Sequence, residues 1–432
     1  MKILPILEKK WKNNSDAFLI TDNKYFYFSD IKKVDLSFLD IVQEGDVVAL
    51  IGDFNLISIA SIFKLIEIGA IVAPITSKTS NDHVYYFETI KAKYIVHNGK
   101  ISNSSHEQNN HELILRLKKS NKAGLIFFST GTTGKPKAII HDVELLFQRF
   151  LTPRIPYKTL NFLMFDHMGG INTLLHTIFN CGTIIGTRDR SVLGILEICK
   201  KHSIEVLPTT PTFIRMLLMS GYIPNEIPNS IKIISYGTEM MDKSTLKECC
   251  DLLPKVDFRQ TYGLSEFCVF RVKSKDRNSL LMKVGGEGVE TKNINDMLHI
   301  KSKYAMLGYL NAPSPFDNEG WYNTKDIIKE EDGYIEIIGR NTDIINVGGL
   351  KFMKSEVEQV ALDYDGVEQA KAYGKKNSIT GQHVEIILQC KKETTIEKKS
   401  LTKYFSSKLP SHMNPKKIIF ENVQVNHRFK KK

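Results

Sequence analysis

The chain has 432 residues, more than a single domain usually contains, so we expect at least two domains. Hydrophobic residues make up 42% and charged residues 25% of it, which is typical of globular proteins and excludes disordered or fibrous classes. The formal net charge is +11, but no recognition-helix, zinc-finger or aromatic ribonucleoprotein pattern accompanies it, so we expect no nucleic-acid partner.

The start of the chain indicates a cytoplasmic protein. Residues Met1–Trp11 lack the sustained apolar core of a signal peptide. The apolar stretch Leu56–Ile75 contains Lys64 and Glu67, which a membrane-spanning helix rarely accepts, so we expect no membrane span. The six cysteines show no C-x-x-C spacing, and we expect free thiols with neither a zinc site nor disulfides.

Short apolar runs alternate with helical stretches through the first three-quarters of the chain. The pattern predicts one helix at 56–68 and strands at 47–51, 70–74, 93–97, 124–128, 183–186, 205–207 and 231–235. Such alternation is typical of parallel sheets covered by helices. The polar segment Asn98–Asn110 is predicted to be an exposed loop.

The pattern of predicted elements changes towards the C-terminus. Between residues 285 and 340, short strands such as Met297–Lys301 and Gly333–Ile338 predict a small β subdomain. Beyond a boundary at 339/340, the pattern predicts helix, strand, helix and strand at 354–362, 384–389, 399–408 and 417–420. The predicted fold is therefore α/β. A large N-terminal domain (1–339) carries parallel-rich sheets, helices and the β subdomain, and a small mobile α+β domain (340–432) follows it.

The segment Phe128–Lys137, Phe-Ser-Thr-Gly-Thr-Thr-Gly-Lys-Pro-Lys, follows a predicted strand. Backbone N–H groups beside glycines, hydroxyl donors and two lysines are what phosphate oxygens require. The Walker A loop does not fit. Only two residues separate Gly131 from Gly134, and Pro136 stands where Walker A has Ser or Thr. We therefore predict a phosphate-binding loop and exclude a P-loop kinase or ATPase.

Ser129–Lys137 closely resembles the signature loop of the adenylate-forming (AMP-binding) superfamily, which includes acyl- and aryl-CoA synthetases, peptide-synthetase adenylation domains and luciferases. Four further segments resemble motifs of this family and follow in the family's order. They are Ser235–Glu239, Thr261–Glu266, Tyr322–Asp326 and Gly339–Lys351. The chain thus resembles the acyl-CoA synthetase or acyl-acid ligase type. The first 120 residues resemble the family only in their alternation of apolar runs and helical stretches.

The resemblance implies a two-step reaction. A carboxylate attacks the α-phosphorus of ATP to give acyl-AMP and pyrophosphate, and a thiol of coenzyme A or of carrier-protein phosphopantetheine then takes the acyl group. Bringing two anions together requires cations and hydrogen-bond donors. The implied cofactors are ATP, Mg²⁺ and the thiol acceptor, and the implied partners are a small carboxylic acid and an acyl carrier protein.

Site residues are implied by the same motifs. Asp326 would hold both ribose hydroxyls, Tyr262 would offer a flat face to the purine, and Thr130 and Glu266 would bind magnesium. Catalytic roles fall to Glu266, to His167 and to a C-terminal lysine, for which spacing indicates Lys430. The nucleotide-binding residues implied are Ser129, Thr130, Gly131, Thr132, Thr133, Gly134, Lys135, Lys137, Gly237, Thr238, Glu239, Tyr262, Gly263, Ser265, Asp326 and Arg340.

Three residues depart from the family's pattern. Lys325 replaces a usual Gly in Tyr322–Asp326, Thr342 stands at the hinge position, and Phe429 precedes Lys430 where Gly is usual. These departures leave open a non-catalytic relative that only binds nucleotide.

The chemical class of the acid substrate is indicated by Phe165–Gly170, Phe-Asp-His-Met-Gly-Gly. This segment resembles the acyl-CoA synthetase string, in which the residue at His167 borders the acyl pocket. The largely apolar Ile171–Leu175 that follows favours a fatty or other hydrophobic acid. Asp166 keeps an amino acid open as the alternative, because peptide-synthetase domains use a nearby Asp to hold an amino group.

The last part of the chain is basic. From Asn341 onward there are 17 Lys and Arg against 10 Asp and Glu. Two explanations fit this excess equally well. The lysines are ordinary solvated surface residues, or they form a surface that binds an anionic partner, such as the phosphates of coenzyme A or an acidic carrier protein.

Overall fold

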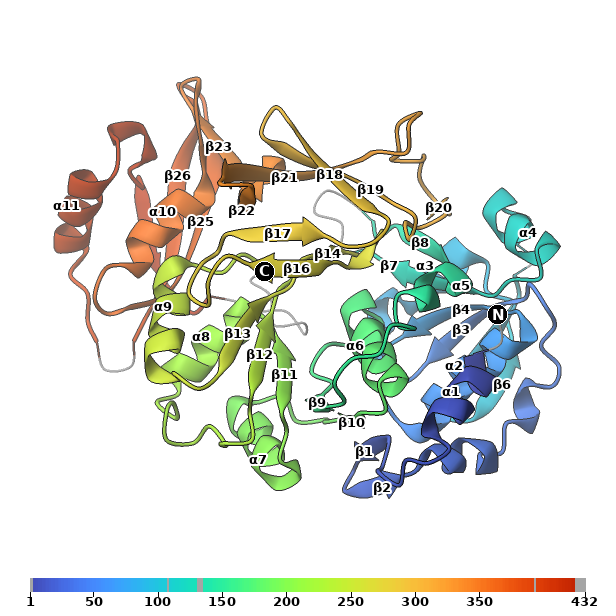
Figure 1. Cartoon of the computed structure of the whole chain (residues 1–432). Helices are drawn as coiled ribbons and strands as arrows, with labels where there is room; N and C mark the ends of the chain where they lie inside the picture. Colours follow the sequence, from blue (N-terminus) through green and yellow to red (C-terminus); the bar gives the residue numbers. More distant parts are fainter. Residues whose placement is uncertain (1–2, 107–108, 130–134, 392–393, 424–432) are drawn as a thin grey trace.

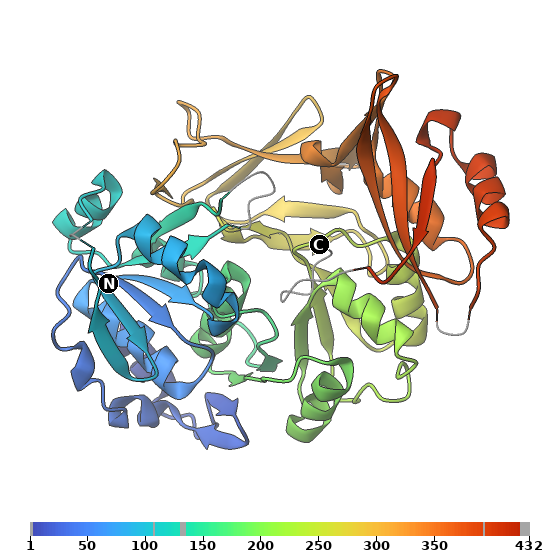
Figure 2. The same cartoon turned by 180° about the vertical axis from the view of Figure 1, so that it is seen from behind.

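The computed structural model describes residues 3–106, 109–129, 135–391 and 394–423. Within these ranges the strands form two seven-stranded sheets, one six-stranded sheet, one five-stranded sheet and a two-stranded hairpin. Figure 1 shows the chain passing from its N-terminal elements on one side to its C-terminal elements on the other, and Figure 2 shows the same arrangement from behind.

The first large sheet is built from the early apolar runs. In spatial order its strands are β20 (Gly308–Tyr309), β8 (Ala138–Asp142), β7 (Gly124–Phe128), β4 (Ile71–Ile75), β3 (Val47–Ile51), β5 (Tyr94–His97) and β6 (Lys100–Asn103). Strands β7, β4, β3 and β5 are parallel. Val48 and Leu50 share a core with α2 (Leu56–Ile68), whereas Val47 and Ala49 share one with α3 (His83–Ile90) and α4 (Glu112–Lys119). Both faces are covered, which explains the unbroken apolar strands.

The second large sheet is also mostly parallel. Its order is β13 (Asp257–Gln260), β12 (Ile233–Tyr236), β11 (Val206–Thr209), β9 (Lys158–Leu160), β10 (Thr183–Ile185), β1 (Leu19–Thr21) and β2 (Lys24–Phe26). Helices α7 (Val192–His202), α8 (Pro211–Met219) and α9 (Lys243–Leu252) share a hydrophobic core with one face. Helix α6 (Met168–Phe179) lies between the two large sheets and contributes Ile171, Leu174 and Leu175 to the core of the first (Figure 1).

Short antiparallel strands follow. The hairpin β14 (Gly263–Leu264) and β15 (Cys268–Val269) precedes the six-stranded sheet. That sheet runs β16 (Arg271–Ser274), β17 (Met282–Gly285), β22 (Tyr334–Arg340), β21 (Tyr322–Glu331), β19 (Met297–Ser302) and β18 (Val289–Ile294). The short strands predicted between residues 285 and 340 are therefore confirmed.

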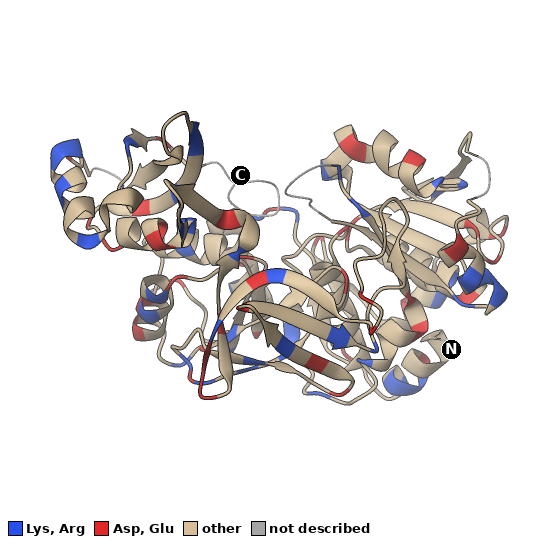
Figure 3. Ribbon diagram, turned by 90° about the horizontal axis from the view of Figure 1, so that it is seen from above, with Lys and Arg blue, Asp and Glu red and all other residues tan. Residues whose placement is uncertain are grey.

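The C-terminal elements have their own sheet and core. The strands are β23 (Ile344–Val347), β24 (Leu350–Met353), β25 (Val367–Asn377), β26 (Gly381–Cys390) and β27 (Lys417–Phe420), and the helices are α10 (Lys354–Leu362) and α11 (Lys398–Lys408). Their buried residues form a separate cluster. Helix α11 carries four lysines and no acidic residue, at the left-hand end of Figure 3.

Shorter elements complete the described chain. They are α1 (Ile3–Trp11), α5 (Val143–Gln148) and the 3₁₀ turns Phe28–Lys33, Ser37–Leu39, Ser77–Asp82, Asn341–Asp343 and Ser411–Met413. No helix within the described ranges is both long enough and apolar enough to cross a bilayer. The large sheet-rich N-terminal part and the smaller C-terminal part confirm the predicted α/β class.

One local prediction is wrong in part. The segment Asn98–Asn110, expected to be an exposed loop, contains strand β6 paired with β5, and its Asn109 is buried. Nδ2 of Asn109 donates to the carbonyl of Ile90, 2.8 Å away. A polar side chain can be buried at little cost when a backbone carbonyl takes its hydrogen bond.

Candidate active site

The two ends of the predicted phosphate loop meet directly after β7. The N–H of Ser129 donates to the carbonyl of Lys137 (2.9 Å), and the N–H of Lys137 donates to Oγ of Ser129 (3.1 Å). Thr130, Gly131, Thr132, Thr133 and Gly134 lie outside the described residues. The described ends therefore fix where the loop leaves and re-enters the first large sheet.

Residues far away in the sequence hold the second half of this loop. The carbonyl of Pro136 accepts hydrogen bonds from the hydroxyl of Tyr85 (2.7 Å) and from Nδ2 of Asn311 (3.1 Å). Nζ of Lys135 lies 5.3 Å from the centre of the Tyr85 ring. Among described residues, Lys135 and Lys137 form no ion pair with an acidic side chain, so both ammonium groups can face an anion.

Lys137 connects the loop to Glu266. Its Nζ lies 4.7 Å from the centre of the Tyr309 ring, and the Tyr309 hydroxyl donates to Oε1 of Glu266 at 2.7 Å. Burial and the nearby Glu266 carboxylate raise the pKa of Tyr309, so this tyrosine stays protonated as the donor. Glu266 is itself buried, in the turn between β14 and β15.

The surroundings of Glu266 are chemically suited to a magnesium ion. A carboxylate with hydroxyl neighbours offers only hard oxygen donors, which Mg²⁺ prefers. Burial and the charge of Glu266 raise the pKa of Tyr322 as well, which places a second tyrosine beside this carboxylate. The donor set fits the ion, while the other predicted ligand, Thr130, lies outside the described residues.

A third cluster joins the Tyr-Gly turn to the predicted ribose carboxylate. The hydroxyl of Tyr262 donates to Oδ2 of Asp326 at 2.6 Å, and Nε of Arg340 donates to Oδ1 at 2.9 Å. Asp326 is 3% exposed. Burial, and then the charge of Asp326, raises the pKa of Tyr262 well above its ordinary value. The ring of Tyr262 also stacks on Phe270, with ring centres 5.8 Å apart.

Lys325 occupies the position at which the family usually has glycine. Its φ of 61° lies in the left-handed region that glycine favours. The turn is fixed on both sides, because the N–H of Lys325 donates to Oδ1 of Asn323 (2.8 Å) and the N–H of Asp326 donates to Oγ1 of Thr324 (3.1 Å). The departure therefore leaves the glycine-type backbone in place and Asp326 in position.

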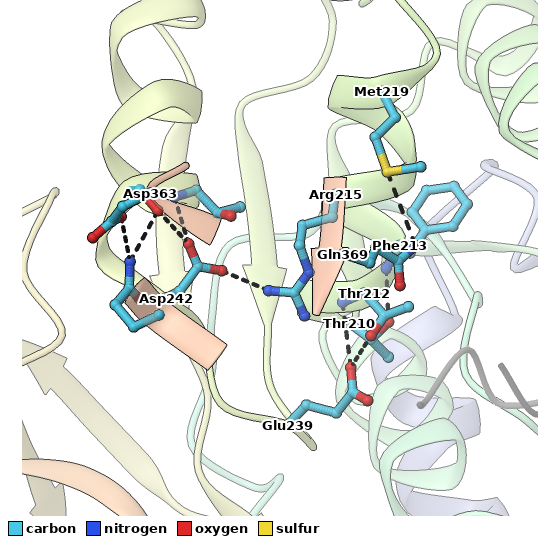
Figure 4. A network of polar contacts seen from close by, with 12 residues as sticks. Thr210, Thr212, Phe213, Arg215, Met219, Glu239, Asp242, Asp363 and Gln369 are labelled. Carbon is cyan, nitrogen blue, oxygen red and sulfur yellow. Dashed lines mark hydrogen bonds and ion pairs between the residues drawn. The ribbon is translucent and has the colours of Figure 1, made fainter. Parts of the chain in front are cut away.

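The predicted adenine segment follows β12. A Cβ on Gly237 would lie 2.2 Å from Oγ1 of Thr261, so only glycine allows this close approach. Thr238 adopts a φ of 70°. Oε2 of Glu239 accepts from Oγ1 (2.6 Å) and from the N–H (3.3 Å) of Thr212, in the first turn of α8 (Figure 4). The structure thus places Gly237 and Thr238 at the end of β12 and uses Glu239 to tie that end to α8.

His167 begins helix α6. Its Nδ1 accepts from the N–H of Gly169 at 3.0 Å, which caps the helix. A Cβ on Gly170 would lie 2.1 Å from the carbonyl of Met164, so this glycine is required by the backbone of the preceding turn. Gly169 lines a cavity.

This cavity has a volume of about 670 Å³ and lies between α6 and the second large sheet. Gly169, Gly237, Thr238 and Thr261 are among the residues that line it. The acyl-pocket string, the adenine segment and the start of the Tyr-Gly turn therefore all contribute to one cavity. Its size is that of a small-molecule site.

Comparison with known proteins decides the family. The model of the family described as AMP-binding enzyme matches residues 37–291, which is more than half of the chain. The chain belongs to the AMP-binding enzyme family. This confirms the resemblance read from the motifs.

Relatives of this AMP-binding enzyme include ligases for different acids. It is 23% identical to 4-coumarate--CoA ligase-like 6 of Arabidopsis thaliana over 71% of this chain and 60% of that protein. It is 25% identical to the medium/long-chain-fatty-acid--[acyl-carrier-protein] ligase FadD10 of Mycobacterium tuberculosis over 57% of this chain and 52% of that protein. The matches thus span between half and two-thirds of these relatives.

Solved structures share the fold. The o-succinylbenzoate CoA synthetase of Bacillus subtilis, in complex with its acyl-adenylate intermediate, has a TM-score of 0.76 at 18% identity and covers 99% of this chain and 96% of that one. ATP-bound MatB of Rhodopseudomonas palustris has a TM-score of 0.81 at 17% identity, with 98% and 96% covered. These likenesses establish the fold over nearly the whole AMP-binding enzyme.

The structure brings several of the predicted site residues of this AMP-binding enzyme into contact with one another. Tyr262, Asp326 and Arg340 are in direct contact, and Lys137 reaches Glu266 through Tyr309. Gly263 and Ser265 lie in the β14–β15 hairpin that carries Glu266: a Cβ on Gly263 would lie 2.6 Å from the carbonyl of Cys268, and the carbonyl of Ser265 accepts from His141 at 2.7 Å. Lys430 lies outside the described residues.

Several residues of the site escaped the sequence analysis. Tyr85, Asn311 and Tyr309 hold the loop and Glu266, yet they belong to no recognised motif. One signal was available for α8: Thr210-Pro-Thr212 directly after an apolar strand is a typical helix start, and Oγ1 of Thr210 accepts from the N–H of Phe213 at 3.1 Å.

Proposed function

We propose that this chain activates a carboxylic acid with ATP and transfers the acyl group to a thiol. In the first step a carboxylate oxygen bonds to the α-phosphorus while the bond from that phosphorus to the β-phosphate bridging oxygen breaks, which releases pyrophosphate. In the second step a thiolate bonds to the carbonyl carbon and AMP leaves. The observation that carries the proposal is the buried Asp326, held by Tyr262 and Arg340.

Asp326 is suited to ribose because of how its carboxylate is occupied. Each oxygen accepts one hydrogen bond from the protein, and a carboxylate oxygen can accept a second. Two neighbouring hydroxyls could therefore bind without displacing Tyr262 or Arg340. The Arg340 side chain is half-exposed, so the guanidinium can also reach an anion from the solvent side. We assign the ribose to Asp326 and an adjoining phosphate or ribose oxygen to Arg340.

The remaining roles follow from position. Ser129, Lys135 and Lys137, with residues 130–134, would hold the β- and γ-phosphates. Gly237, Thr238 and Glu239 would line the adenine, with Tyr262, Gly263 and Ser265 beside them. His167 would border the acid, and Lys430 would bridge the carboxylate and the α-phosphate.

Glu266 and Thr130 would hold magnesium, which neutralises phosphate charge when it is bound. The hydrogen bond from the buried Tyr309 hydroxyl keeps the Glu266 carboxylate oriented. We place the reaction in the cytoplasm, with coenzyme A or a carrier protein as acceptor. The lysines of α11 offer either acceptor a basic surface (Figure 3).

The sequence favoured a fatty or other hydrophobic acid, with an amino acid as the alternative. That preference rested on Ile171–Leu175, whose aliphatic members Ile171, Leu174 and Leu175 contribute to the core of the first large sheet. The acid therefore has to be inferred from the residues that do line the cavity.

The test is the exchange of labelled pyrophosphate into ATP over a panel of fatty, aromatic, hydroxylated and amino acids. We expect exchange that depends on the acid. Lys430→Ala should abolish exchange and spare ATP binding, while Lys432→Ala should leave both intact. ATP binding without exchange for any acid would contradict the proposal and indicate the non-catalytic relative. Loss of exchange in Lys431→Ala instead would move the bridging role to that lysine.

A further inference from the structure

Helix α6 has two different faces. Ile171, Leu174 and Ile178 are buried in the core of the first large sheet, at the spacing of one helical face. On the opposite face, Asn172 and His176 lie one turn apart and line the cavity. The wall that helix α6 offers to the cavity is therefore rich in hydrogen-bonding groups rather than in aliphatic side chains.

Some polar groups on this wall serve the helix itself. Oγ1 of Thr173 donates to the carbonyl of Gly169 (2.9 Å), and the amide of Asn180 donates to the carbonyl of His176 (2.6 Å) while accepting from the N–H of Arg154 (2.6 Å). The side chains of Asn172 and His176, in contrast, make no hydrogen bond to any described residue. The partly buried Asn172 and the exposed His176, at the outer part of the wall, thus line the cavity with their hydrogen-bonding capacity unused by described residues.

The opposite wall presents further groups of the same kind. Ser235 of β12 lines the cavity between the apolar Ile233 and Pro208, and its hydroxyl has no partner among the described residues. At the end of β13, Oε1 of Gln260 is buried without a hydrogen bond in the described chain. Buried polar atoms are normally satisfied, so an unpaired one beside a cavity indicates a ligand that pairs with it.

The charged residues that line the cavity are largely engaged with other protein groups. Arg259 pairs with Asp257 at 2.6 Å, and Lys275 pairs with Glu331 at 3.1 Å. The guanidinium of Arg277 donates to backbone carbonyls, including that of Val256 at 3.0 Å. Of these lining residues on the β13 and β16 side, Arg259 and Lys275 are paired with carboxylates, and Arg277 is held by backbone carbonyls. Asp276 also lines this side and forms no ion pair with a described residue. The groups that α6 and β12 present to a ligand are neutral.

The positions of Asn172 and His176 along α6 determine how far each lies from Gly169. Helix α6 connects the parallel strands β9 and β10, so it starts at the carboxyl edge of the second large sheet, where Gly237 and Thr238 follow β12, and runs away from that edge. At ~1.5 Å per residue, Asn172 lies about 4–5 Å and His176 about 10 Å further along the axis than Gly169. A substrate whose carboxylate lies at the Gly237 end would meet Asn172 first and His176 one turn later.

We infer that the acid carries an uncharged hydrogen-bonding group, a hydroxyl, carbonyl or amide, about one to two helical turns from its carboxylate, and that Asn172 and His176 bind it. This rests on the proposed function, because it takes the cavity as the acid site. An alkyl chain would displace water from these side chains and leave them unpaired, which costs on the order of 10-fold or more in kcat/KM.

The test compares acid-dependent pyrophosphate exchange for ω-hydroxy acids of increasing length with alkyl acids of matched length. We expect the wild-type chain to prefer a hydroxy acid by on the order of 10-fold or more in kcat/KM. Asn172→Leu and His176→Leu should each reduce or reverse this preference. Asn172→Asp keeps the shape of the side chain but adds a negative charge, and it should shift the preference towards acids that carry an amino group.

Thr173→Val is the matched control, because its hydroxyl is already bound within α6, and it should keep the wild-type preference. ATP binding and thermal unfolding of each variant report on folding. Exchange with no acid would overturn the proposed function. Strong exchange with alkyl acids that Asn172→Leu and His176→Leu leave unchanged would overturn the inference about polar recognition and leave the proposed function standing.

Discussion

Lys325 shows how a single residue can depart from a family motif without moving the site. Its side chain is exposed, so the residue contributes no buried packing. Its backbone nevertheless takes the left-handed conformation, which costs a residue with a Cβ about 1–2 kcal/mol. The hydrogen bonds of Asn323 and Thr324 outweigh this cost and keep Asp326 in place.

Lys325→Gly should therefore stabilise the chain slightly. Glycine removes the strain but loses roughly 0.5–1 kcal/mol of conformational entropy, so the net gain should be about 0–1 kcal/mol. Lys325→Val should destabilise it, since a β-branched residue fits this conformation worse. Urea unfolding measures both. A loss of stability in Lys325→Gly larger than in Lys325→Val would show that the lysine side chain itself is needed.

At the scale of elements, the β14–β15 hairpin that carries Glu266 is held from outside. Nε2 of His141 in β8 donates to the carbonyl of Ser265 at 2.7 Å, and the guanidinium of Arg149 donates to the carbonyls of Phe267 (3.0 Å) and Val269. Burial lowers the pKa of His141 to about 4. The neutral ring is therefore the form that supports the hairpin.

His141 should make the folded state sensitive to acid. Because its folded pKa lies below its ordinary value of 6.5, its contribution to stability is complete above pH 6.5 and is lost as the pH falls towards 4. The full loss amounts to about 3 kcal/mol. In His141→Gln, the unfolding midpoint should fall less between pH 6.5 and 4.5 than in the wild-type chain.

His97→Gln, at an exposed histidine, is the control for this measurement. It should keep the pH dependence of the wild-type chain. If His141→Gln showed the same pH dependence as wild type, the buried neutral imidazole would not be the group that senses acid.

The sequence was sufficient for elements that are continuous in the chain. The predicted helix at 56–68 coincides with α2, and the strands at 47–51 and 124–128 coincide with β3 and β7, because long apolar runs between turn residues leave few alternatives. Helix α6 was a harder case. The spacing of Ile171, Leu174 and Ile178 already indicates an apolar helix face. The polar face opposite was missed because the segment is apolar in its overall composition.

The site could be predicted only where motifs carry it. Asp326, Arg340 and Tyr262 were found because each lies in a recognisable string, and the structure places them in contact. Tyr309 could not be found, because its contact with Glu266 joins residues 43 positions apart and depends on how β20 lies beside β8. Contacts of this kind follow from the tertiary fold alone.

At the scale of the whole molecule, described residues of the C-terminal elements make polar contacts with helices α8 and α9, which cover the second large sheet. Nε2 of Gln359 donates to Oγ of Ser244 at 3.2 Å, and the buried Gln369 lies beside Sδ of Met219, 3.9 Å from its Nε2 (Figure 4). Polar contacts of this kind are compatible with the mobility expected of the C-terminal part, which stays a prediction. A boundary at 339/340 and a hinge at Thr342 stay predictions, consistent with β22 ending at Arg340.

We propose that a nucleotide bound at Asp326 places the acid in the cavity beside α6. The most direct measurement is a crystal structure of the chain with a non-hydrolysable acyl-adenylate mimic, in which a sulfamate replaces the phosphate. We predict the ribose on Asp326, the adenine beside Gly237 and Thr238, and the acyl group in the cavity lined by Asn172 and His176. A mimic whose ribose lies away from Asp326, or whose acyl group leaves that cavity empty, would contradict this arrangement of the two sites.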